Sequence, residues 1–107
     1  MAKILDLSKK KPALPVKLPD ETLIRVYTPT KAMLEEFITI GAQLDRATDD
    51  FEALNQLYDV TARLMSNNAG GRKLSASEIS EMLDVGDVVV FFRAYTEFIS
   101  ELKSAKN

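Results

Sequence analysis

Apolar residues recur every three or four positions over most of the chain after residue 28, which is the spacing of one buried helix face. Polar residues fill the positions between them, so each segment has one hydrophobic and one hydrophilic side. The pattern predicts four helices, over about residues 29–46, 50–66, 76–83 and 86–104. The second has the cleanest division, with an apolar stripe of Phe51, Leu54, Leu57, Tyr58, Thr61, Leu64 and Met65.

Each predicted helix is preceded by residues that favour a helix start. Thr28 offers an N-cap hydroxyl, and Pro29 has the backbone angle of a first helical position. Ser75 and Glu78 form a capping box, in which each side chain accepts from the other residue's backbone. The two remaining helices are expected to begin at the pair Asp49 and Glu52, and at Asp84 or Asp87.

The fourth segment is ambiguous at its start. Val88-Val89-Val90-Phe91-Phe92 has strand propensity, and Gly86 weakens a helix. The apolar positions nevertheless keep helical spacing over four turns, which we weigh above five residues of propensity. The segment is therefore predicted to be a helix with the apolar stripe Val88, Phe91, Phe92, Tyr95, Phe98, Ile99 and Leu102.

Before residue 28 the chain has the pattern of extended structure. All four prolines lie in the first thirty residues, where they exclude a helix interior. Residues 14–18 and 22–27 are predicted to form two strands joined by a turn at Pro19, with Ile24 and Val26 on one face. The edges of this hairpin are expected to be unpaired, so it must lean on the helices or on a neighbouring chain.

The predicted fold class is mainly α, with a small N-terminal β-hairpin at residues 14–27 followed by a four-helix bundle-like domain. Hairpin and helices together form a single α-rich domain, residues 14–107. Residues 1–13 are expected to be a basic flexible arm. Five lysines and one aspartate stand within residues 1–17, although the net charge of the whole chain is −2.

The 107-residue chain contains neither histidine nor cysteine. Zinc sites built on those residues, thiol nucleophiles, disulfides and Ser-His-Asp triads are thereby excluded. Carboxylates and lysines remain, but they show no convergent cluster, so we expect no enzyme, no metal and no cofactor. The longest apolar run has five residues, against the roughly 20 of a membrane span, and a cytoplasmic protein is the default expectation.

Three motifs that suggest chemistry fail on detail. The acidic residues from Asp45 lack the alternating oxygens, the central glycine and the final glutamate of an EF-hand. Residues 67–73 lack the spaced glycines of a phosphate loop and join two helices, which indicates a flexible connector. Residues 74–95 have the order of a helix-turn-helix, but the second helix begins with Asp87 and valines, where DNA recognition needs basic and polar side chains.

A surplus of apolar positions is more informative. Val89 and Val90 lie outside the core stripe of the fourth helix, and Val60 lies at the edge of the second. Single surface valines are common. Here, together with the open hairpin, they suggest that the fourth helix is covered by a partner as well as by its own domain. The expected partner-binding residues are Val89, Val90, Phe91, Tyr95, Phe98 and Val60.

The order of these segments resembles the small tail assembly chaperones of bacteriophages and prophages of Gram-positive hosts. The similarity covers nearly the whole chain, but it lies in the order and residue character of the segments and includes no specific motif. Between its first and last features lies a helix pair split by an acidic turn. The similar features are Leu5-Asp6-Leu7-Ser8-Lys9-Lys10-Lys11, then Tyr27-Thr28-Pro29-Thr30-Lys31, then Leu74-Ser75-Ala76-Ser77-Glu78, and finally Phe91-Phe92-Arg93-Ala94-Tyr95-Thr96-Glu97-Phe98.

The resemblance implies a protein without catalytic residues that binds the tape measure protein during tail assembly. It would keep that long helical chain soluble and help recruit tail tube subunits around it. It also implies a location in the host bacterial cytoplasm, absence from the mature virion and self-association along the partner. A shallow apolar helical face suits an amphipathic helix laid in a groove, and neither a membrane nor nucleic acid is expected as a partner.

Two other functions stay open: a DNA-binding regulator that uses residues 74–95, and a small adaptor or antitoxin-like module that folds on a partner. The ending Ala105-Lys106-Asn107 can be encoded GCA AAA AAC, a run on which a ribosome can slip back one base. Chaperones of this kind are commonly made in two lengths by such a slip. An overlapping downstream reading frame would therefore favour the phage interpretation.

Overall fold

The computed structural model describes residues 12–44 and 50–104, with side chains to residue 102. This part of the chain is mostly helical with one two-stranded antiparallel sheet, which confirms the mainly α prediction and the N-terminal hairpin. Apart from Pro12 and Ala13, the predicted basic arm lies outside the described residues. The elements are β1 (Ala13–Lys17), β2 (Leu23–Tyr27), α1 (Lys31–Gly41), α2 (Phe51–Ser66), α3 (Ala76–Met82) and α4 (Val85–Ser104).

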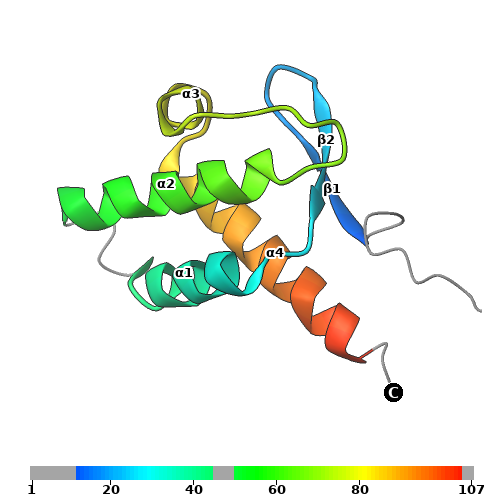
Figure 1. The fold of residues 1–107 in the computed structure, drawn as a ribbon. Helices are drawn as coiled ribbons and strands as arrows, with labels where there is room; N and C mark the ends of the chain where they lie inside the picture. The colour runs from blue at the N-terminus through cyan, green and yellow to red at the C-terminus, as the bar shows by residue number, and fades with distance from the viewer. Residues whose placement is uncertain (1–11, 45–49, 105–107) are drawn as a thin grey trace, which may run out of the picture.

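The helices form a crossed arrangement (Figure 1). α1 and α2 lie one above the other and pack together, while α4 passes diagonally behind both. α2 also packs on α3 and on β2, so it contacts three other elements. α3 has seven residues and is seen end-on in Figure 1, across α2 from α1. A four-helix bundle is not confirmed, because the long α4 crosses its neighbours and α3 is short.

The hairpin places one apolar face against the helices. β1 and β2 pair antiparallel, with Leu14 opposite Val26 and Val16 opposite Ile24. Side chains directly opposite one another share a face, so these four point the same way. Ile24 and Val26 share this face, as predicted; both are buried in the core, and Leu14 and Val16 pack partly buried against it.

Local hydrogen bonds hold the turn between the strands. The N–H of Glu21 donates to the carbonyl of Leu18 at 2.9 Å. Glu21 has a φ of 74°, the left-handed conformation that glycine adopts most easily. The N–H of Thr22 donates to the carboxylate of Asp20 at 3.0 Å. Hydrogen bonds from the side chain and backbone of Thr22 lower the pKa of Asp20 below its ordinary 3.8.

The chain that follows α2 covers the outer edge of β2. The N–H of Tyr27 donates to the carbonyl of Asn67 at 2.8 Å, and that of Ala69 donates to the carbonyl of Arg25 at 3.0 Å. Asn68 forms a bridge with Val26 between these two bonds. The prediction that both edges of the hairpin are unpaired is therefore wrong for β2, because a segment distant in sequence takes the place of a third strand.

The side chain of Asn68 fixes this covering segment. Asn68 is 7% exposed, and its Nδ2 donates to the carbonyls of Met65 and Arg72 at 2.7 and 2.8 Å. Its Oδ1 accepts from the N–H of Arg72 at 3.1 Å. Residues 67–73, predicted to be a flexible connector, are therefore tied to the end of α2 and to the hairpin.

Two of the predicted helix starts are confirmed. The capping box of Ser75 and Glu78 is present at α3. At α4, the N–H of Asp87 donates to the carboxylate of Asp84 at 2.8 Å, and the N–H of Asp84 donates to Asp87 at 3.1 Å. At α2 the capping carboxylate is that of Asp50, which accepts from two backbone N–H groups; the predicted Asp49 lies outside the described residues.

The predicted start of α1 is wrong by two residues. The cap is Thr30, whose hydroxyl accepts from the N–H of Met33 at 3.2 Å, so Pro29 precedes the helix. Thr28 directly follows β2, and its carbonyl accepts from the side chain of Asn67 at 3.0 Å. α1 ends at Gly41, before the predicted residue 46, which lies outside the described residues.

Aromatic side chains of α1 and α4 form the centre of the core. The ring of Phe37 lies 4.7 Å from that of Phe92 and 5.2 Å from that of Tyr95, between centroids. The hydroxyl of the buried Tyr95 donates to the carbonyl of Tyr27 at 2.9 Å, which joins α4 to the hairpin. The predicted stripe of α4 is confirmed: Val88, Phe91, Phe92 and Tyr95 are buried, and Phe98, Ile99 and Leu102 are half-buried.

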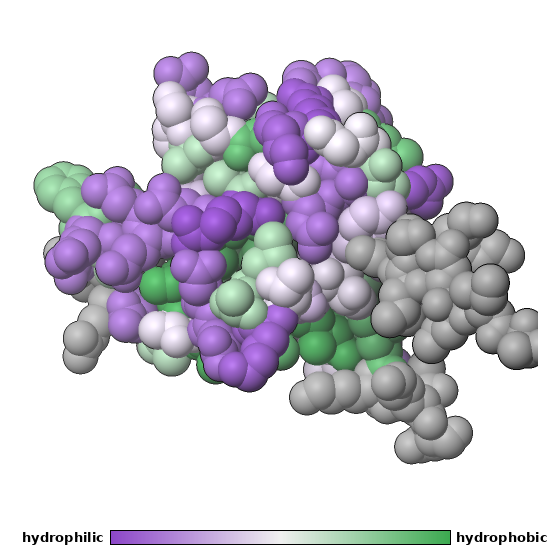
Figure 2. Space-filling view, in the orientation of Figure 1, coloured by the Kyte–Doolittle hydropathy of each residue, from purple (hydrophilic) through white to green (hydrophobic). Residues whose placement is uncertain are grey.

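The buried side of α2 differs from the prediction at two positions. Phe51 is 85% exposed, since it begins the helix at the end of the molecule. Val60, predicted to lie at the edge, is 3% exposed because α2 packs on three elements and is buried over a wider arc. The opposite side is hydrophilic, as Figure 2 shows across the front of α2. The exposed polar residues there are Glu52, Asn55, Gln56, Asp59 and Arg63.

Candidate protein-binding surface

A groove of about 300 Å³ runs between the outer edge of β1 and the N-terminal half of α4. Leu14 and Val16 line its β1 side, and Val90, Phe91 and Ala94 line its α4 side. Val90 is 64% exposed, so the groove opens to solvent over an apolar side chain. We name this site the β1–α4 groove.

Backbone geometry makes the β1 edge of this groove a poor template for another strand. The carbonyl of Arg25 and the N–H of Tyr27 point away from β1 and bond to the segment after α2. In an antiparallel ladder the residues opposite these, Ala13 and Pro15, also point outward, away from β2. Pro15 has no N–H to donate, so an added strand would lack a central hydrogen bond. The groove is therefore suited to side chains of a helix.

Two charged side chains stand at the rim of the groove. Lys17 forms an exposed ion pair with Glu21 at 2.9 Å. Asp87 caps α4 together with Asp84. Behind this rim the hydroxyl of Tyr58 donates to the carbonyl of Leu83 at 2.9 Å. Burial, followed by the two aspartates, raises the pKa of Tyr58, so the hydroxyl stays a donor at neutral pH.

The predicted partner-binding residues fall into two groups. Val90 is exposed, and Val89 and Phe98 are half-buried, so these three present surface to solvent. Val60, Phe91 and Tyr95 are buried within the chain itself, at 3%, 5% and 0% exposure. Phe91 still reaches the wall of the groove, whereas Tyr95 and Val60 belong to the core. Burial raises the pKa of the Tyr95 hydroxyl.

A second apolar groove, of about 500 Å³, lies on the other side of α4, against α1. Phe37 and Ile38 line it from α1, and Phe92, Arg93 and Glu97 line it from α4. Ile38 is 61% exposed. Sequence reasoning missed this groove, since Ile38 has the helical spacing of a core residue and nothing in its neighbours distinguishes it. We name it the α1–α4 groove.

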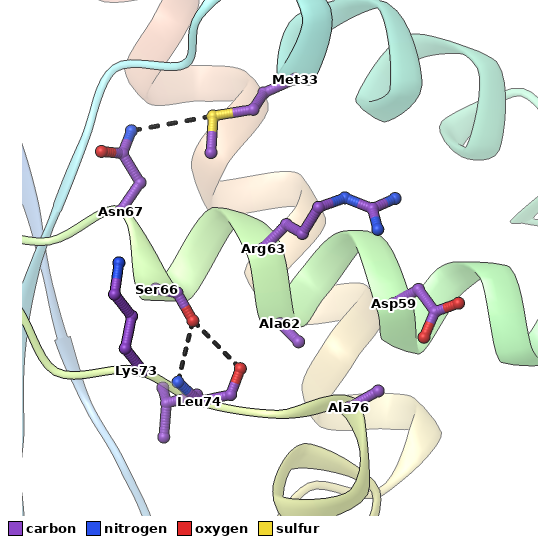
Figure 3. A pocket seen from close by; sticks show the side chains of 9 residues that line it. All are labelled: Met33, Asp59, Ala62, Arg63, Ser66, Asn67, Lys73, Leu74 and Ala76. Carbon is purple, nitrogen blue, oxygen red and sulfur yellow. Dashed lines mark hydrogen bonds between the residues drawn. The ribbon is translucent and has the colours of Figure 1, made fainter.

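Two further hollows are lined mostly by polar side chains. Figure 3 shows one of about 450 Å³, where the segment after α2 crosses back over that helix. The hydroxyl of Ser66 is occupied there by both backbone groups of Leu74, at 2.8 and 3.0 Å. Arg63 and Lys73 point in different directions in Figure 3, and Arg63 pairs with Glu36 at 2.6 Å. The two cations therefore do not converge on one point where an anion could bind.

A hollow of about 870 Å³ lies between α1 and the polar side of α2 and is lined mostly by charged and amide side chains, Arg63 among them. Within residues 12–44 and 50–104, no three acidic side chains gather to hold a metal ion. No helix in the same ranges is long and apolar enough to span a membrane.

Comparison with known protein families, with curated proteins and with solved structures finds no match to this chain.

Proposed function

We propose that this chain is a tail assembly chaperone of a bacteriophage or prophage, which binds the tape measure protein and aids assembly of the tail tube without catalysing a reaction. The observation that carries the proposal is the β1–α4 groove, which the exposed Val90 lines on its α4 side. The order of segments, from residues 5–11 to the last helix, supports the choice of family. The host cytoplasm is the site of action, and the mature virion lacks the protein.

The dimensions of the groove fit a short stretch of amphipathic helix. Its α4 wall runs from Asp87 to Ala94, about 10 Å at 1.5 Å per residue, or two helical turns. A partner helix can place apolar residues at positions i, i+3 or i+4 and i+7 along that length. A buried leucine contributes about 1.5–3 kcal/mol, and association itself opposes binding. Two or three such anchors give a weak single contact.

Weak single contacts suit a long partner. A tape measure protein offers many amphipathic segments in one chain, and copies bound side by side would cover its apolar surface together. When several contacts act on one chain, each later contact is intramolecular and total affinity rises. The proposed role, keeping a long helical chain soluble, needs coverage of many segments rather than one tight site.

The gene neighbourhood provides the first test. The proposal expects a very long coding sequence with a helical pattern in the same gene cluster. That long product is then expressed alone and together with this chain, and its soluble fraction is measured. The proposal expects a severalfold increase in soluble product on co-expression. A gene without such a neighbour, or an unchanged soluble fraction, contradicts it.

Two variants locate the contact. Val90→Glu places a charge in the groove and should abolish the increase in soluble product. Phe51→Glu is the matched control, because Phe51 is also an exposed apolar residue, 85% exposed, and lies on another helix. An acidic residue there suits the first turn of α2. Equal effects of both variants would contradict a role for the β1–α4 groove.

DNA binding by residues 74–95 is less well supported. α3 and α4 follow one another closely, as in a helix-turn-helix, with α3 ending at Met82 and α4 beginning at Val85. However, the carboxylates of Asp84 and Asp87 occupy the N-terminus of α4, where phosphates or bases would need donors. A gel shift at low salt tests this function directly, and we expect no shift at micromolar protein.

A further inference from the structure

The outer side of α4 forms a ridge between the two grooves. Val90, Arg93, Glu97 and Ser100 follow one another at spacings of three and four residues, and all four are exposed. Val90 borders the β1–α4 groove, while Arg93 and Glu97 border the α1–α4 groove. We name these four residues the α4 ridge. A ridge with a hollow on each side is a shape that another helix can pack against.

The two charges of the ridge are free to bind elsewhere. Arg93 and Glu97 are four residues apart, but neither belongs to an ion pair in the described part of the chain. A cation and an anion on one exposed face are therefore left for another molecule.

We propose that the occupant is a second copy of this chain, whose α4 packs antiparallel on the first about a twofold axis near residue 95. In that register Arg93 faces Glu97 of the second copy, and Glu97 faces its Arg93. Val90 then faces Ser100 of the second copy, because both pairs have the same midpoint. The ridge is thus complementary to itself, as a twofold interface requires.

Ile38 adds an apolar contact to the same interface. It borders the α1–α4 groove beside Arg93 and Glu97, and it is 61% exposed. A twofold axis brings the same side of each copy together, so Ile38 lies near Ile38 of the second copy. The two ion pairs set the register, and this apolar contact excludes water beside them. The α4 register of this dimer is argued from these residues alone, and it does not depend on a tape measure protein.

Charge reversal tests the register. Arg93→Glu leaves four acidic groups facing one another, and Glu97→Arg leaves four basic groups. Each single variant should therefore be monomeric at concentrations where the natural chain dimerises. The double variant Arg93→Glu/Glu97→Arg restores both pairs and should dimerise again. An equimolar mixture of the two single variants should form a heterodimer, since every facing pair is then of opposite sign.

The measurement is sedimentation velocity over a range of concentrations at low salt. Lys31→Glu is the control, because it changes an exposed charge on α1 that pairs only with Glu35 in the described structure; it should leave dimerisation unchanged. Raising the salt should weaken the natural dimer. A natural chain that stays monomeric, or single variants that dimerise like it, would overturn the proposal. Neither result would alter the solubility test made with the natural chain, because that test changes no residue of the α4 ridge.

Discussion

The side chain of Asn68 contributes to the stability of the fold in a way that the sequence pattern does not indicate. The variant Asn68→Ala measures this contribution. The change removes three hydrogen bonds that the side chain makes with Met65 and Arg72. At about 1 kcal/mol each, their loss lowers the free energy of unfolding by about 3 kcal/mol. Domains of this size have about 5–15 kcal/mol in total, so the effect is large.

The assay is urea and thermal unfolding followed by circular dichroism. About 3 kcal/mol corresponds to a fall in Tm of more than about 10 °C for a domain near 100 residues. Asn55→Ala is the matched control: Asn55 is exposed on α2, and alanine favours a helix, so stability should hold or rise. If the free energy of unfolding of Asn68→Ala lies within about 1 kcal/mol of that of the natural chain, the hydrogen bonds of Asn68 do not stabilise the segment after α2 against the hairpin.

Three further outcomes follow from the geometry. Glu21→Gly should raise the free energy of unfolding by about 0.5–1 kcal/mol in a urea titration, because glycine relieves the positive φ of 74°. Phe37→Ala should lower it by about 3–5 kcal/mol, whereas Phe51→Ala, at an 85% exposed position, should change it by less than about 0.5 kcal/mol. Hydrogen bonds from Thr22 lower the pKa of Asp20 in the folded chain. The ionised Asp20 therefore stabilises the fold above its unfolded pKa, and this contribution is lost as the pH falls through its folded pKa. The stability difference between the natural chain and Asp20→Asn should therefore shrink below about pH 4 in unfolding curves measured against pH.

Local sequence rules predicted most elements because their causes are local. Ser75 and Glu78 satisfy each other's backbone within one turn, so the start of α3 was readable from four residues. The period of α4 outweighed the strand propensity of its valines because the stripe packs on α1 and the hairpin. That Thr30 caps α1 in place of the predicted Thr28 did not follow from the local sequence, since the carbonyl of Thr28 bonds to the distant Asn67.

The surfaces were less predictable, because exposure depends on which elements meet. Val60 is buried where three elements converge on α2, and Phe51 is exposed where the helix projects beyond its neighbours. Of the partner-binding residues expected from sequence, Val90 is the one that stands well exposed beside a groove. The place of Ile38 at the edge of a groove follows only from the packing of α1 on α4.

Hydrogen exchange on the complex with the tape measure protein tests the central claim most directly. Backbone amides of this chain are compared with and without the partner, after co-expression and purification of the complex. We expect slower exchange in residues 14–19 and 87–94, which line the β1–α4 groove, and unchanged exchange on the polar side of α2. Slower exchange confined to α2, or no change at residues 87–94, would contradict the claim.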